Sequence, residues 1–166
     1  STRGLVETLW RYFEACVRNP PSSRASVGQR ILLLSLAGDG EHAGMLYERA
    51  QALGAEAFRR AIDAARREGN LERDALDPRN AWSFIEHVGS MITSGGLSGR
   101  SVIPYAGSKV RLVREAVLFC GRGLGLKDAA LAAHAPGSSR SRDRASARPP
   151  QTIERIHSAT NRSKRG

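Results

Sequence analysis

The sequence predicts an all-α fold, a five-helix antiparallel bundle, from three observations. Apolar residues recur at helical spacing in five segments. Each segment ends near a glycine or proline that interrupts helices, and no stretch shows the convincing alternation of a strand. With 166 residues, of which 40% are hydrophobic and 5% aromatic, the chain is long enough for one domain with its own core.

Residues that start or stop helices set the limits of the first two helices. A first helix is predicted over residues 2–18, and Pro20 ends it because proline disfavours helix in the residue before it. Ser26 and Gln29 have the Ser-x-x-Gln spacing of a capping box, which predicts the start of a second helix. That helix is apolar on nearly every side up to Gly38, so we expect it to be buried.

Three longer helices are expected in the remainder of the chain. The longest covers residues 41–68 and is closed by Gly69. The next has the clearest start signal, because Asp77 can cap the helix while Pro78 takes the first helical position, where its missing donor costs nothing. The last is expected over residues 108–121.

The last two of these helices carry apolar side chains on two sides. A helix at the surface of a monomer needs only one apolar stripe. The sequence therefore predicts that each of these helices has a second packing partner. The periodicity alone does not decide which stripe faces the core and which faces the partner.

The basic charge of the chain is concentrated at its end. The net charge is +10, and residues 135–166 contain eight basic and two acidic residues. We expect a helical domain over residues 1–126 and a basic, disordered tail over residues 127–166. Such a tail can bind phosphates through counterion release, or it can be a solvated extension. It has no Tyr, Trp or Phe on which bases could stack, which weakens the case for specific single-strand binding.

Little in the sequence indicates catalysis, a metal or a cofactor. The four histidines lack metal-ligand spacing, and the glycines at 121, 123 and 125 follow a helix, whereas a dinucleotide fingerprint follows a strand. The expectation is therefore a protein that is not an enzyme and has no cofactor. Two isolated cysteines, Cys16 and Cys120, indicate packed thiols and a cytoplasmic location. No apolar run is long enough to span a membrane, and the N-terminus lacks the pattern of a signal peptide.

Ligand binding is the more serious possibility. Bulky side chains on the first, third and fourth helices could line a cavity, with tyrosine, glutamate or histidine as polar anchors. The candidate ligand-binding residues are Trp10, Phe13, Met45, Phe58, Trp82, His87 and Met91, with Tyr12, Glu14 and Tyr47 as further anchors. Plain core packing remains the alternative for each of them, since composition does not distinguish a filled cavity from an empty one.

Several segments, taken in order, resemble a known family. Residues 60–71 form the end of a long helix with a Gly-x-Leu turn, and an Asp-Pro-x-x-Ala-Trp helix start follows at residues 77–82. Residues 88–92 and 114–125 complete the pattern. Together, over about residues 5–126, they resemble the C-terminal effector-binding and dimerisation domain of the tetracycline-repressor (TetR) family of bacterial transcription regulators, in its actinobacterial type.

The resemblance implies a homodimer, built from the last two helices of each copy in a four-helix interface, and a cavity for a small apolar effector. It suggests a repressor that binds operator DNA through an N-terminal helix-turn-helix domain. No such domain lies in this chain, which begins without Met inside a predicted helix, as a fragment would. The expected interface residues, which include small side chains that allow close approach, are Ala81, Ile85, Val88, Gly89, Ile92, Val113, Ala116, Val117 and Cys120.

Two other functions stay open at this point. One is a nucleic-acid-binding protein that acts through its basic tail. The other is a helical adaptor with a fully packed core and no small-molecule ligand.

Overall fold

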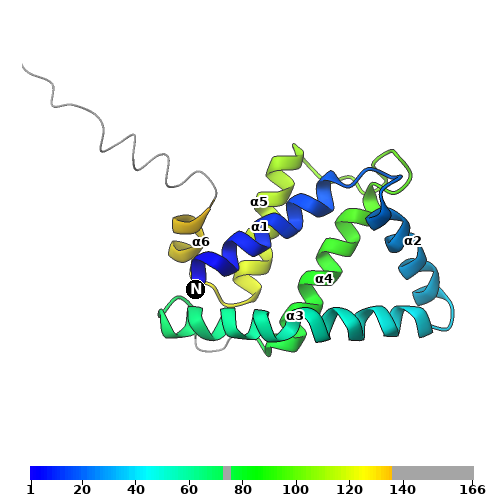
Figure 1. The fold of residues 1–166 in the computed structure, drawn as a ribbon. Helices are drawn as coiled ribbons and strands as arrows, with labels where there is room; N and C mark the ends of the chain where they lie inside the picture. Colours follow the sequence, from blue (N-terminus) through cyan, green and yellow to red (C-terminus); the bar gives the residue numbers. More distant parts are fainter. Residues whose placement is uncertain (73–75, 136–166) are drawn as a thin grey trace, which may run out of the picture.

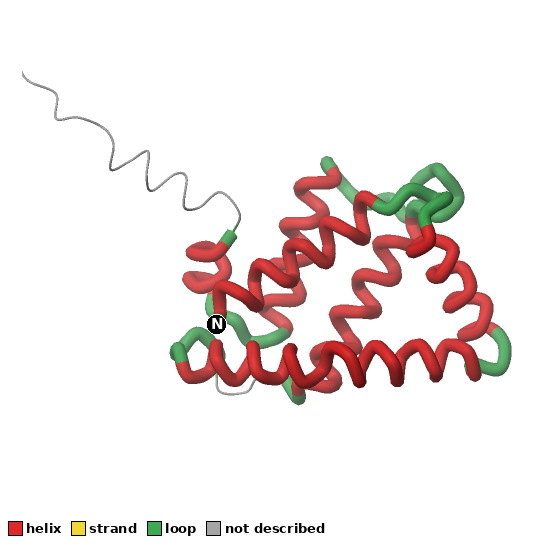
Figure 2. The backbone as a smooth tube through the Cα atoms, viewed as in Figure 1, coloured by secondary structure: helices red, strands yellow, loops and turns green. Residues whose placement is uncertain are grey.

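The computed structural model describes residues 1–72 and 76–135, and it confirms the all-α fold. Its helices are α1 (Thr2–Arg18), α2 (Arg24–Ala37), α3 (Glu41–Arg67), α4 (Pro78–Gly95), α5 (Lys109–Gly123) and α6 (Asp128–His134). The described residues thus contain six helices rather than the five expected, and their only β-type pairing is an isolated bridge between Leu71 and Leu126 (Figures 1 and 2). None of these helices is both long and apolar enough to cross a membrane.

The helix start predicted at Asp77 and Pro78 is confirmed, and α5 begins with a similar cap. The Asp77 carboxylate accepts a hydrogen bond from the Arg79 backbone N–H at 2.9 Å, and Pro78 occupies the first turn of α4. The Ser108 hydroxyl accepts from the Arg111 backbone N–H at 3.3 Å at the start of α5. Each cap satisfies a donor that the helix leaves unpaired, so these starts follow from local sequence.

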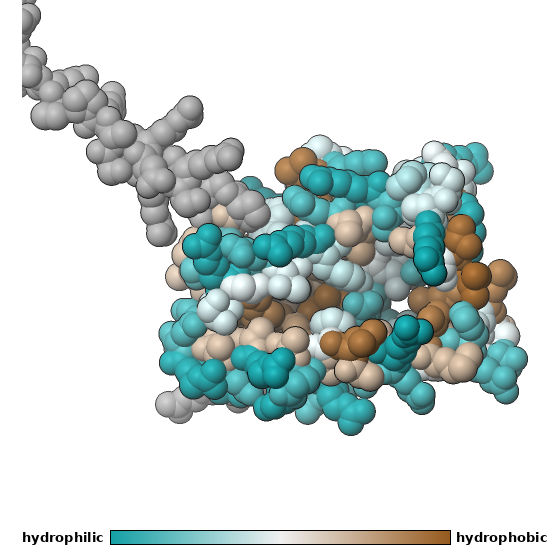
Figure 3. Space-filling model, viewed as in Figure 1, coloured by the Kyte–Doolittle hydropathy of each residue, from teal (hydrophilic) through white to brown (hydrophobic). Residues whose placement is uncertain are grey.

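The start and the burial of α2 differ from the expectation. Ser23 is the N-cap and accepts from the Ser26 backbone N–H at 3.1 Å, whereas the Ser26 hydroxyl is buried and donates to the Pro20 carbonyl at 2.9 Å. The expected burial of the helix is also wrong, since Leu34 is 74% exposed and Leu36 53%. Because apolar residues lie on all sides of α2, its sequence did not show which face would be buried. Among the described helices, α2 contacts only α3 and α4 (Figure 1). Figure 3 shows apolar side chains gathered on the edge of the molecule where Figure 1 places α2.

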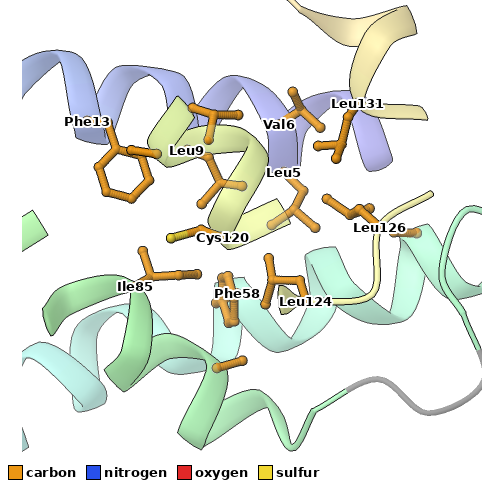
Figure 4. Packing of buried hydrophobic residues seen from close by; sticks show 14 of the residues in the cluster. Leu5, Val6, Leu9, Phe13, Phe58, Ile85, Cys120, Leu124, Leu126 and Leu131 are labelled. Atoms are coloured by element: carbon orange, nitrogen blue, oxygen red, sulfur yellow. The ribbon is translucent and has the colours of Figure 1, made fainter. Parts of the chain in front are cut away.

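The core is organised around α1, which contacts α3, α4, α5 and α6. Val6 and Phe13 have no exposed surface, and Leu5 and Leu9 are almost as deeply buried. Figure 4 shows these side chains meeting Phe58, Ile85 and Cys120 from three other helices. The spacing of the four α1 residues is that of a single helical face, so one stripe supplies most of the contacts that hold the fold together.

The folded part extends beyond the expected boundary at residue 126. Leu131 of α6 is buried. Its side chain packs so closely against Gly121 that a Cβ on this glycine would come within 2.5 Å of it. The backbone N–H of Lys127 donates to the Asn70 carbonyl at 3.0 Å, which joins this segment to the loop after α3. The domain therefore includes α6. Residues 136–166, where the basic tail was expected, lie outside the described residues.

Candidate functional site

Two hollows flank α4, one on each side. The first, called the inner cavity here, has a volume of about 240 Å³ and is lined by residues of α1, α2, α3 and α4 and of the loop after α1. The second, called the α4/α5 groove, has a volume of about 650 Å³ and lies between α4 and the C-terminal half of α5. In Figure 1, α2, α3 and α4 run along three sides of a triangle, and residues of these helices and of α1 line the inner cavity.

The inner cavity has a mixed lining in which polar side chains outnumber apolar ones. Leu32, Leu46 and Ala50 supply apolar surface from α2 and α3. The polar lining residues are Tyr12, Cys16, Asn19, Gln29, Tyr47, Glu86, Ser90 and Thr93. Small-molecule sites combine apolar surface with polar groups that fix the orientation of the ligand, and both are present here.

Glu86 and Tyr12 form the electrostatic centre of this cavity. Burial raises the pKa of the Glu86 carboxyl, and a hydrogen bond from Tyr12 and the nearby His87 oppose that rise. Burial also raises the pKa of the Tyr12 hydroxyl, to which the negative charge of Glu86 adds. The Tyr12 hydroxyl therefore stays protonated and is available as a donor to the carboxylate.

The close approach of Tyr12 to α4 requires a glycine. A Cβ on Gly89 would overlap the Tyr12 hydroxyl and ring. Because Gly89 carries no side chain, the tyrosine ring can lie directly against the α4 backbone, one turn from Glu86. Gly89 is buried, so its role is to make room for Tyr12 rather than to meet a second chain.

Gln29 joins α2 to α4 at the edge of the cavity. Its amide nitrogen donates to the Ser94 hydroxyl at 3.2 Å and to the Ser90 carbonyl at 3.4 Å, while the Ser90 hydroxyl donates to its carbonyl oxygen at 3.5 Å. The sequence had suggested a capping role for Gln29, but the side chain bridges two helices. Only the packing of α2 on α4 reveals this role.

None of the expected ligand-binding residues lines the inner cavity, and they differ in how deeply they are buried. Phe13 and Phe58 are buried in the core, and Trp10 and Trp82 are half-buried against it. Met45, His87 and Met91 are exposed. Of the expected anchors, Tyr12 and Tyr47 do line the cavity, whereas Glu14 lies 3.8 Å from Arg18 in a surface ion pair.

Trp82 and His87 still bear on the cavity indirectly. Trp82 packs edge-on against Phe58, with 5.3 Å between ring centroids, and lies over Gly54 of α3. His87 meets Tyr47 edge-on at a centroid distance of 6.0 Å. These contacts hold α3 against α4 beside the cavity, which is a packing role.

The expected interface residues lie mainly inside the single chain. Val88 is half-buried in the α4/α5 groove, while the others are buried in the domain: Ala81, Ile85, Gly89, Ile92, Val113, Ala116, Val117 and Cys120. Burial raises the pKa of the Cys120 thiol to about 11. The stripe that contains these residues is thus the one that faces the core of the chain.

The second apolar stripe is the exposed one. On α4 it consists of Phe84, Val88 and Met91, of which Phe84 is 54% exposed, and on α5 Phe119 is 71% exposed. Phe84, Val88 and Phe119 line the α4/α5 groove. Charged groups border this apolar strip on the α5 side, where Arg111 pairs with Glu115 and Arg122 with Asp128, each at 2.8 Å. An apolar centre with a polar rim is the usual anatomy of a protein interface.

The described residues give no support for a metal site or for a cysteine nucleophile at the inner cavity. Within residues 1–72 and 76–135, no group of three or more His, Cys, Asp or Glu side chains could hold a metal ion. Burial raises the pKa of the Cys16 thiol at the cavity wall. A raised pKa lowers the fraction of reactive thiolate, which makes Cys16 a packing residue rather than a nucleophile.

Comparison with known proteins adds no assignment: no protein-family model, curated protein or solved structure matches this chain.

Proposed function

We propose that this chain is the effector-binding and dimerisation domain of a ligand-responsive transcription regulator of the tetracycline-repressor type. The class rests on the sequence resemblance and on two features of the fold. One is the inner cavity, which is lined by α1 to α4 and open to solvent, and the other is an exposed apolar stripe on α4 and α5.

The observation that carries the proposal is that α4 serves both features at once. One side of α4 presents Glu86, Ser90 and Thr93 to the inner cavity. A second side presents Phe84, Val88 and Met91, at i, i+4 and i+7, to the outside. Between them, a third side is buried in the core. A ligand that moves or stiffens α4 therefore changes the surface offered to a partner.

The mechanism follows as a shift in populations. A ligand that binds one arrangement of α1 to α4 more tightly than another favours that arrangement. A second copy that packs on α4 and α5 then receives the change through the same helix. The DNA-binding element would be supplied by a segment outside this chain, and no residue present is assigned to it.

The proposal is tested by measuring ligand binding and association together. Size-exclusion chromatography with light scattering at tens of micromolar should show a dimer, since an interface of about 1,600 Å² gives a much lower Kd. A thermal-shift screen of small hydrophobic compounds should find stabilising ligands. By linkage, a compound that binds the cavity should also change the dimer dissociation constant. A monomer that no compound stabilises would instead favour a packed adaptor domain.

A further inference from the structure

The lining of the inner cavity has an unbalanced charge. Glu86 is the only charged residue among those that line it, and no Lys or Arg is present there. Throughout residues 1–72 and 76–135, the acidic partners of the ion pairs are on other parts of the surface, and Glu86 takes part in none of these pairs. The one basic side chain that contributes to its pKa shift is His87, the next residue on the same helix.

The protein satisfies Glu86 only in part. The Tyr12 hydroxyl lowers the pKa of the carboxyl by interacting with it, whereas an ionised carboxylate has about four acceptor positions. A partly buried carboxylate without a cation is costly, since buried charges in proteins are normally paired. Glu86 therefore favours an incoming group that brings a positive charge and several hydrogen-bond donors.

The rest of the lining suits an apolar body attached to that charge. The rings of Tyr12 and Tyr47 and the side chains of Leu32 and Leu46 come from three different helices. Aromatic faces attract ammonium groups, so the two tyrosine rings add to the attraction that the Glu86 carboxylate exerts. The volume of about 240 Å³ lies below the 300–1,000 Å³ or so of pockets for drug-sized molecules, so the ligand is a small one.

We propose that the inner cavity binds a small lipophilic amine, whose ammonium group donates to Glu86 while its apolar group lies between α1, α2 and α3. This inference rests on the proposed function, because it names the chemical class of the effector. It replaces the purely apolar effector that the sequence led us to expect. The purely apolar alternative would leave the Glu86 carboxylate without a cation.

The test compares three probes of similar shape and different charge. Phenethylamine, phenethyl alcohol and hydrocinnamate are titrated into the full chain at neutral pH and followed by calorimetry or by chemical shifts. The amine should bind about tenfold or more tightly than the alcohol, because a hydrogen bond to a charged group contributes more than a neutral one. The acid should bind most weakly, since it repels Glu86.

Two variants localise the effect. Glu86→Gln keeps the shape of the side chain and should abolish the preference for the amine while the affinity for the alcohol stays within about threefold. Glu14→Gln removes a carboxylate from the surface of α1 and should leave all three affinities unchanged. Circular dichroism confirms that both variants are folded before they are titrated.

The outcomes separate this inference from the proposed function. If the alcohol or the acid binds the wild type as tightly as the amine, or if Glu86→Gln keeps the amine preference, the ligand class is wrong and an effector cavity still stands. If none of the probes binds while the chain forms a dimer, the cavity is not a ligand site. The ligand class and the effector part of the proposed function are then both overturned.

Discussion

Phe119 and Ala116 lie one turn apart on α5, and replacing each with glutamate should have opposite consequences. Phe119 is 71% exposed, whereas Ala116 is 6% exposed. The proposed function places Phe119 in an interface between two copies and Ala116 in the core of each copy. Phe119→Glu should therefore give a folded monomer, and Ala116→Glu should give an unfolded or aggregated chain.

The size of the first effect follows from the exposed ring. A fully buried aromatic side chain removes about 200 Å² from water, so about 140 Å² of Phe119 is available to a partner. At about 25 cal/mol per Å², this contributes about 3.5 kcal/mol per ring and about 7 kcal/mol for the two rings of a symmetric dimer. Losing it weakens association by about five orders of magnitude. The monomer itself should change by no more than about 0.5 kcal/mol.

The second effect is larger than the domain can tolerate. A glutamate at position 116 must either overfill the space around Val117 and Cys120 or bury a carboxylate without a partner. Burying an ion costs several kcal/mol, against a total stability of about 5–15 kcal/mol for a domain. Light scattering reports the mass of each variant, and thermal unfolding followed by circular dichroism reports its stability. A dimeric Phe119→Glu, or a folded monomeric Ala116→Glu, would refute this assignment of the two stripes.

The remaining predictions concern the inner cavity. Gly89→Ala should destabilise the domain by about 1–3 kcal/mol in denaturant unfolding, because its Cβ overlaps Tyr12. Gly44→Ala on α3, where a Cβ meets nothing within 4 Å, should instead stabilise it by up to about 1 kcal/mol. Glu86→Gln should raise the melting temperature at neutral pH. The pKa of Glu86 is raised by burial, so its ionisation costs stability as pH rises from the unfolded pKa through the folded one.

Each of these has a measurement that would contradict it. Equal stability changes for Gly89→Ala and Gly44→Ala would show that Tyr12 does not pack against α4. The gain from Glu86→Gln should shrink as the pH falls through about 4.3, the ordinary pKa of glutamate, since below it the wild-type carboxyl is protonated in both states. A gain that is independent of pH would mean that ionisation of Glu86 is not its cause.

Local signals in the sequence were enough to place most helices. Asp77, Pro78 and Ser108 act at the backbone groups next to them, so their effect does not depend on the rest of the fold. The same local logic failed at Ser26 and Gln29. There the expected capping pair bonds to the Pro20 carbonyl and to α4, which are partners that the motif does not contain.

The candidate site was predicted less well, because it depends on which helices meet. The bulky residues chosen for a pocket, such as Phe13 and Phe58, are those that the core buries most readily. The cavity is instead lined by smaller or polar residues, including Tyr12, Glu86 and Ser90, that no single helix displays as a pattern. A signal for two of the lining residues was present in the sequence, since Tyr12 and Tyr47 had been named as anchors.

By itself, the sequence determined the helical class, the limits of the long helices and the surplus of apolar surface on α4 and α5. Helical periodicity fixes the angle between side chains on one helix but not what lies opposite each face. Only the tertiary structure decided that α1 occupies the centre, that Ala116 faces inward and Phe119 outward, and that Glu86 lines a cavity. The physical reason is that the burial of a helix face depends on which other helices pack against it. A single helix therefore has no buried face until its neighbours are in place.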